Sequence, residues 1–137
     1  MSTPFTGGCL CGALRYECTA EPAGAGLCYC RDCQKSTGSG HASTLFVPNV
    51  ELTIFGDVKY YEKQADSGRT VRRGFCPTCG SQLLSRADVL PDFVGIRAGS
   101  LDEPSWVKFT MAIYTSSAQS WDAIAQDLAV FPEMPSQ

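Results

Sequence analysis

The chain has 137 residues, of which 44% are hydrophobic and 18% are charged, and its formal net charge is −3. This length predicts a single domain over residues 1–137 with a modest hydrophobic core. No apolar run approaches the roughly 20 residues of a membrane-spanning helix, so we expect no membrane span. The negative charge argues against nucleic acid as a partner, because nucleic acid needs a basic surface, and favours a small molecule.

The first eight residues lack the basic region and the apolar core of a signal peptide, so we expect a cytoplasmic protein. The compartment matters because the chain has eight cysteines. In an exported protein they would predict a framework of disulfides, whereas cytoplasmic thiols stay reduced. The close spacing of the cysteines also favours metal binding over disulfides.

Turn residues divide the chain into short segments, most of which have the composition of β-strands. Apolar and polar residues alternate over residues 13–19, where Leu14, Tyr16 and Cys18 share one face. Further strands are expected at residues 43–47, 51–55, 58–62, 70–75, 93–98 and 107–114. Residues 20–26, which contain proline and glycines, are expected to form a loop. Many short strands separated by turns predict a mainly β fold.

Two short helices are expected. One covers residues 31–36, and Gly38 would end it in the left-handed conformation. The other covers residues 121–128 after Ser120, a favourable N-cap. The proline-containing tail, residues 131–137, is expected to be irregular.

Seven of the eight cysteines fall into three clusters: Cys9 and Cys11; Cys28, Cys30 and Cys33; and Cys76 and Cys79. Zinc takes four protein ligands in a structural site but three in a catalytic site, where one position stays open. Two clusters of two would make one closed site, and the cluster of three would make an open one. A glycine follows the first and the third cluster, at Gly12 and Gly80, and can adopt a positive φ. We therefore pair these two clusters.

Two other residues are candidates for the open position of the middle cluster. His41 is the sole histidine, but it enters a strand, so we expect it to line the site rather than bind the metal. Cys18 lies on an apolar strand face, so we expect a buried core thiol. A redox function for Cys30 and Cys33 is disfavoured, because such motifs belong to a βαβ context that the chain lacks.

Several segments resemble the glutathione-dependent formaldehyde-activating enzyme family, which also includes centromere protein V. The order of the three cysteine clusters is similar, and so are the residues around them. The similar segments are residues 8–16, 30–38, 73–80, 97–102, 113–115 and 120–121. The resemblance runs from about residue 7 to residue 131.

This resemblance implies a compact, mainly β, zinc-bearing fold of short antiparallel strands with one or two short helices. It implies two zinc ions per chain, a structural one at Cys9, Cys11, Cys76 and Cys79 and a catalytic one at Cys28, Cys30 and Cys33. The implied activity is that of a carbon–sulfur lyase, which joins formaldehyde and glutathione reversibly as S-hydroxymethylglutathione. Leu27 and Tyr29 stand where many members have histidine, which concerns the substrate more than the metal.

Glutathione carries two carboxylates, and several polar residues lie next to the middle cluster. Arg31 and Lys35 are candidate partners for the carboxylates, as is Arg69, and Gln34 and Thr37 are candidate hydrogen-bonding partners. The alternative for each is an ordinary solvated side chain. The alternative for the whole chain is a non-catalytic zinc-binding module that interacts with another macromolecule. An open zinc position favours the enzyme, with a small thiol or thiol adduct as its partner.

Overall fold

The structure is a computed structural model and describes residues 3–65 and 67–135. Within these residues the strands form two sheets, so the predicted mainly β fold is confirmed. The smaller sheet has the order β1-β2-β5 and is antiparallel. Its strands are β1 (Phe5–Gly8), β2 (Arg15–Cys18) and β5 (Leu52–Phe55).

The larger sheet has the order β11-β10-β3-β4-β9-β8-β7-β6 in the described part of the chain. Its strands are β3 (Gly24–Cys28), β4 (Ala42–Pro48), β6 (Lys59–Gln64), β7 (Thr70–Phe75), β8 (Gln82–Ala87), β9 (Phe93–Arg97), β10 (Met111–Ile113) and β11 (Ala129–Val130). Most neighbours are antiparallel, but β10 runs parallel to both β3 and β11. The expectation of antiparallel strands is therefore wrong at one end of the large sheet, where β10 has two parallel neighbours.

The helix α1 (Arg31–Thr37) confirms the first predicted helix. Cys30 is its N-cap, and the Cys30 Sγ accepts a hydrogen bond from the backbone N–H of Cys33 at 3.3 Å. Gly38 ends the helix with a φ of 73°, as expected of a left-handed cap. Three short 3₁₀ turns are η1 (Asn49–Glu51), η2 (Ala98–Ser100) and η3 (Thr115–Ser117). No described helix has the length and apolarity needed to cross a membrane.

Two predicted elements are wrong. Residues 121–128 form turns instead of a helix, because the Asp122 carboxylate contacts His41 and the chain then returns to the sheet as β11. The expected loop at residues 20–26 already contains the start of β3, which pairs with β4 on one side and β10 on the other. The strand expected at residues 107–114 is reduced to β10. Of the tail expected to be irregular, residues 131–135 are irregular, and residues 136–137 lie outside the described part of the chain.

The hydrophobic core lies between the two sheets. Alternate residues of β4 and β9 point into it, including Leu45 and Ile96, and they pack with Leu14 and Tyr16. Cys18 has an exposed fraction of 0% and belongs to this core, which confirms the prediction of a buried thiol.

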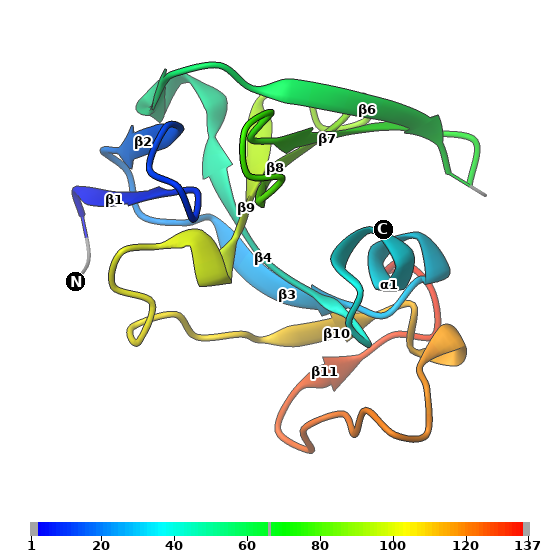
Figure 1. The fold of residues 1–137 in the computed structure, drawn as a ribbon. Coiled ribbons are helices and arrows are strands. Elements are labelled where there is room, and N and C mark those ends of the chain that lie inside the picture. Colours follow the sequence, from blue (N-terminus) through cyan, green and yellow to red (C-terminus); the bar gives the residue numbers. More distant parts are fainter. Residues whose placement is uncertain (1–2, 66, 136–137) are drawn as a thin grey trace.

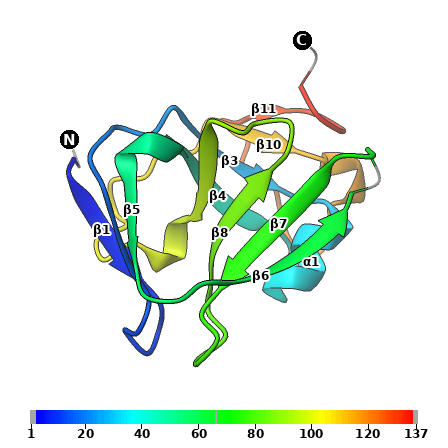
Figure 2. The same cartoon turned by 90° about the horizontal axis from the view of Figure 1, so that it is seen from above.

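The other face of the large sheet carries the remaining residues of the same strands and lines a cavity. The helix α1 lies on this side, between the β6–β7 end and the β10–β11 end of the sheet (Figure 1). Seen from above, β6 and β7 pass over α1 (Figure 2). The Lys63 Nζ of β6 contacts the Asp32 Oδ1 of α1 at 2.8 Å and ties the helix to this end of the sheet.

Candidate metal centres

Four thiols converge where the β1–β2 turn meets the β7–β8 turn. They belong to Cys9, Cys11, Cys76 and Cys79, and their Sγ atoms lie within 4.8 Å of one another. The two turns are built alike: the Gly12 N–H donates to the Cys9 carbonyl, and the Gly80 N–H donates to the Cys76 carbonyl. Both glycines have positive φ, of 83° and 81°. The pairing of the first and third clusters therefore agrees with this geometry.

These four thiols fit a closed zinc site. The Sγ of Cys11 is 3.6 Å from that of Cys9 and 3.8 Å from that of Cys76. Tetrahedral zinc with Zn–S bonds of about 2.3 Å requires sulfur–sulfur distances of about 3.8 Å. Backbone N–H groups also point at sulfur, as that of Thr78 does toward the Cys76 Sγ at 3.4 Å. Hydrogen bonding to Ser81 lowers the pKa of Cys79 to about 5, which favours the thiolate that a metal needs.

A second group consists of Cys28, Cys30 and Cys33, whose Sγ atoms also lie within 4.8 Å of one another. Cys28 ends β3, Cys30 caps α1, and Cys33 lies in the first turn of α1. Hydrogen bonds from Cys28 and Cys30 lower the pKa of Cys33, and positive charge on Arg97 and Arg73 lowers it further. Among the described residues this group contains three ligands and no fourth, so a bound metal would retain an open position.

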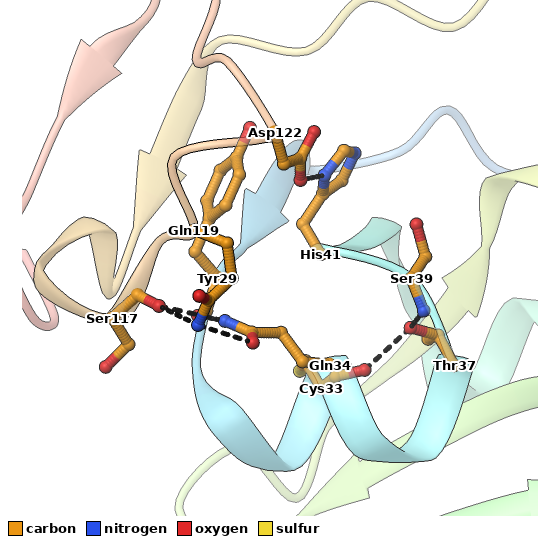
Figure 3. A network of polar contacts seen from close by, with 9 residues as sticks. All are labelled: Tyr29, Cys33, Gln34, Thr37, Ser39, His41, Ser117, Gln119 and Asp122. Atoms are coloured by element: carbon orange, nitrogen blue, oxygen red, sulfur yellow. Dashed lines mark hydrogen bonds and ion pairs between the residues drawn. The ribbon is translucent and has the colours of Figure 1, made fainter.

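A polar network behind α1 holds this second group in place (Figure 3). The buried Gln34 donates from Nε2 to the Tyr29 carbonyl at 2.7 Å and to the Ser117 carbonyl at 3.0 Å. The Tyr29 N–H donates to the Ile113 carbonyl at 3.0 Å, which fixes the backbone between Cys28 and Cys30 to β10. The position of these cysteines is therefore set by contacts to segments far along the chain.

His41 lies outside the three-cysteine group. Its Nδ1 is 2.6 Å from the Asp122 Oδ2, and its ring packs on the Tyr29 ring with a centroid distance of 4.8 Å. His41 is therefore outside the ligand group, as expected, but it lines a hollow separate from the cysteine cavity instead of the site itself. Cys18 is also outside both groups, and all eight cysteines, each in the described part of the chain, are free thiols.

A comparison with protein families finds a match between residues 4–117 and the family described as glutathione-dependent formaldehyde-activating enzyme. The chain belongs to this family. The resemblance predicted from the cysteine clusters is thus confirmed. The family match includes both candidate metal centres, because all seven clustered cysteines fall inside residues 4–117.

A solved structure supports the fold of this member of the formaldehyde-activating family. The chain superposes on the crystal structure of a Rhodobacter sphaeroides protein from the Northeast Structural Genomics programme with a TM-score of 0.57. The alignment covers 75% of this chain and 90% of that chain, at 22% sequence identity. A comparison with curated proteins finds no match.

The five residues predicted to contact glutathione lie in different places. Arg31 and Arg69 line a cavity of about 220 Å³ together with the three clustered cysteines. Lys35 is exposed and lines a separate hollow against β6, and Thr37 lines a third one beside His41. Gln34 and Thr37 already hydrogen-bond within the chain, since Thr37 donates from Oγ1 to the Cys33 carbonyl at 2.7 Å. The structure thus brings Arg31 and Arg69 of these five residues to the cysteine cavity.

Two arginines that received no role from the sequence also line this cavity. Arg73 in β7 and Arg97 in β9 are buried, with exposed fractions of 8% and 9%. Both lie in segments that resemble the formaldehyde-activating family. The signal in the sequence is a charged residue on the inward face of a predicted strand. This signal can be used only when it is known which face of the strand points inward.

Proposed function

We propose that this chain is a zinc-dependent carbon–sulfur lyase that acts on the adduct of a thiol and a carbonyl compound. The reference adduct is S-hydroxymethylglutathione, formed from glutathione and formaldehyde. The observation that carries this proposal is the convergence of three thiols on one cavity without a fourth cysteine or histidine in the described residues. Three protein ligands and an open position are typical of catalytic zinc, and four ligands of structural zinc.

The reaction requires one bond to break and one proton to move. In the cleavage direction the C–S bond breaks with its electron pair on sulfur. The hydroxyl proton leaves the carbon-bound oxygen, formaldehyde forms, and the proton balance closes when sulfur becomes the glutathione thiol. A zinc ion held by Cys28, Cys30 and Cys33 would supply Lewis acidity and affinity for sulfur.

The chain's own residues would hold and shield the reacting group. The thiolates of Cys28, Cys30 and Cys33 are the ligands, and Gln34 and Tyr29 fix their backbone. The cavity in front of them is walled by apolar side chains such as Phe46, Phe93 and Ile113, which exclude water from the reacting atoms. Arg31 and Arg69, at the same cavity, are the predicted glutathione contacts that this arrangement supports best, although Arg31 also donates to the Gln34 Oε1.

The second proposed ion would be structural. It would sit among Cys9, Cys11, Cys76 and Cys79 and tie the small sheet to the β7–β8 turn. Both sites need free thiols, so we propose a reducing compartment, the cytoplasm. Serine substitution of Cys9, Cys11, Cys76 or Cys79 should affect folding more than chemistry, because the ion proposed there is structural.

Exchange NMR tests the proposed reaction, because the uncatalysed addition of formaldehyde to glutathione is itself reversible. With ¹³C-formaldehyde, glutathione and zinc-loaded protein, we expect faster exchange between free and thiol-bound carbon than without protein. Cys33→Ser should abolish the acceleration, whereas the buried Cys18→Ala, outside both cysteine groups, should keep it. If wild type gives only the uncatalysed rate and binds no glutathione, the chain is instead a non-catalytic zinc-binding module.

A further inference from the structure

Two buried guanidinium groups face the cysteine cavity without a matching anion. The Nε atoms of Arg73 and Arg97 are buried and have no hydrogen-bond partner. Arg97 donates from Nη1 to the Thr44 Oγ1 at 2.7 Å, and neither arginine forms an ion pair with a carboxylate of the described residues. A buried charge costs several kcal/mol unless it is paired, so these groups need a negative partner.

The described residues around the cavity do not supply enough negative charge. The carboxylate among the described lining residues is that of Asp32, and it contacts the Lys63 Nζ at 2.8 Å. The clustered thiols of Cys28, Cys30 and Cys33 are the other groups at the cavity that can carry negative charge. Three thiolates with one divalent metal carry about one negative charge. Four guanidinium groups line the cavity, those of Arg31, Arg69, Arg73 and Arg97, so positive charge remains in excess.

The position of the two arginines follows from strand register. Arg73 pairs with Ser85, and Ser85 pairs with Gly95, two residues before Arg97 on the same face of β9. Both side chains therefore rise from the sheet face that forms the cavity, close to the three thiols. Burial lowers the pKa of Arg97 and the charge of Arg73 lowers it further, whereas the three thiols raise it.

The rest of the cavity is mostly apolar and small. Its walls include Phe46, Val71, Phe93, Met111 and Ile113. Its volume of about 220 Å³ is below the roughly 300–1,000 Å³ of pockets that enclose drug-sized ligands. Glutathione is polar along its whole length, and beyond Arg31 and Arg69 these walls offer it few charged partners. A compact ligand with one anionic end and a short apolar body matches them better.

We propose that Arg73 and Arg97 form a carboxylate-binding subsite beside the three thiols, so that the ligand received there is a small thiol or thiol adduct bearing a carboxylate and a short apolar chain. Guanidinium groups bind carboxylates through paired, charge-assisted hydrogen bonds. This proposal rests on the proposed function in one respect, namely that the ligand reaches the cysteine site through its sulfur. The carboxylate subsite itself depends only on the two arginines.

Calorimetry with a matched pair of thiols tests the subsite without measuring turnover. The probes are 3-mercaptopropionate and 3-mercaptopropan-1-ol, which have the same carbon chain and differ in the carboxylate. For the zinc-loaded wild type we expect 3-mercaptopropionate to bind about tenfold to a hundredfold more tightly, since a hydrogen bond to a charged group contributes about 1.5–3 kcal/mol. Hexanoate, which lacks sulfur, should bind more weakly but compete with 3-mercaptopropionate.

Three variants locate the preference. Arg73→Gln and Arg97→Gln should each bring the affinities of the two thiols to within about threefold. Arg72→Gln is the matched control, because Arg72 is the exposed neighbour of Arg73 in β7 and lies over the Tyr60 ring at 4.4 Å. Circular dichroism and zinc analysis establish that each variant is folded and loaded. If Arg97→Gln does not fold, the affinities of the two thiols for the wild type and for Arg97→Lys still test the subsite.

The outcomes separate the subsite from the proposed function. Equal affinity of the two thiols for wild type overturns the subsite. So does a loss of zinc from Arg73→Gln and Arg97→Gln with the thiol preference unchanged, since the arginines would then serve only the cysteines. Binding of hexanoate without binding of either thiol supports the subsite and overturns the proposed function.

Discussion

A single ion pair fastens the first strands to the segment that follows η2. The Arg15 Nη1 donates to the Asp102 Oδ1 at 2.9 Å, and the Thr6 Oγ1 donates to the Asp102 Oδ2 at 2.6 Å. These hydrogen bonds, that of Arg15 first, lower the pKa of Asp102 from 3.8 to about 2. Because the folded pKa is the lower one, the pair stabilises the fold above about pH 4, and this contribution is lost as the pH falls toward 2.

Asp102→Asn should therefore reduce the free energy of unfolding at pH 7. We expect about 1 kcal/mol, because both side chains are more than 40% exposed and solvent screens the pair. Urea denaturation at pH 7 and at pH 2 measures the effect, which should nearly vanish at the lower pH. Asp127→Asn, at an exposed position without an ion pair among the described residues, is the control. An equal loss in both variants would contradict the assigned contact.

At the scale of elements, Gln34 joins α1 to the β3–α1 connection and to η3. Gln34→Leu has nearly the same size but leaves the carbonyls of Tyr29 and Ser117 without this donor. We expect a loss of about 2 kcal/mol and faster hydrogen exchange at the Tyr29 amide, because an unpaired buried polar group costs about 1–3 kcal/mol. Gln126→Leu, on the exposed 121–128 segment, should change neither value. Unchanged exchange in Gln34→Leu would refute the anchoring role.

Elements with local signals were predictable from the sequence. The helix α1 is short, but it directly follows the middle cysteine cluster and Gly38 marks its end as a left-handed stop. Strands β4, β7 and β9 are rich in β-branched and aromatic residues, so composition alone indicates them. The cysteine clusters are equally local, and their spacing indicated which thiols could share an ion.

Elements that depend on distant partners were not predictable. The strand β3 begins Gly-Ala-Gly, a poor strand sequence, and forms because β4 and β10 pair with both of its edges. The segment 121–128 has a helical start signal, yet the contact of Asp122 with His41 overrides it. Arg73 and Arg97 can be assigned to the site only from the strand register, which places them on the cavity face.

At the scale of the whole molecule, the two cysteine groups should differ in what their loss does. Cys11 and Cys76 are 65 positions apart, so an ion shared by their clusters closes a long loop and joins two turns. Closing such a loop removes unfolded-state entropy worth about 4 kcal/mol in a chain-entropy description. The three-cysteine group spans one short segment and closes no comparable loop.

Cys79→Ser should therefore lower the thermal unfolding midpoint sharply, and Cys30→Ser should leave a folded protein. Each variant should retain one zinc ion fewer than wild type, as measured by elemental analysis of the dialysed protein. Circular dichroism during heating gives the midpoint, and Cys18→Ala controls for loss of a thiol outside both groups. Equal destabilisation by Cys79→Ser and Cys30→Ser would show that the groups are not a structural and a catalytic site.

The seven clustered cysteines are proposed to form one closed and one open metal site. Cobalt in place of zinc distinguishes the two sites, because thiolate ligands give cobalt distinct absorption bands. We predict two cobalt ions per chain, with an added thiol, glutathione or 3-mercaptopropionate, altering the bands of one ion only. Cys33→Ser should remove the responsive ion and leave the other spectrum intact. If neither ion responds to added thiols, or if both respond, the chain does not have one closed and one open site.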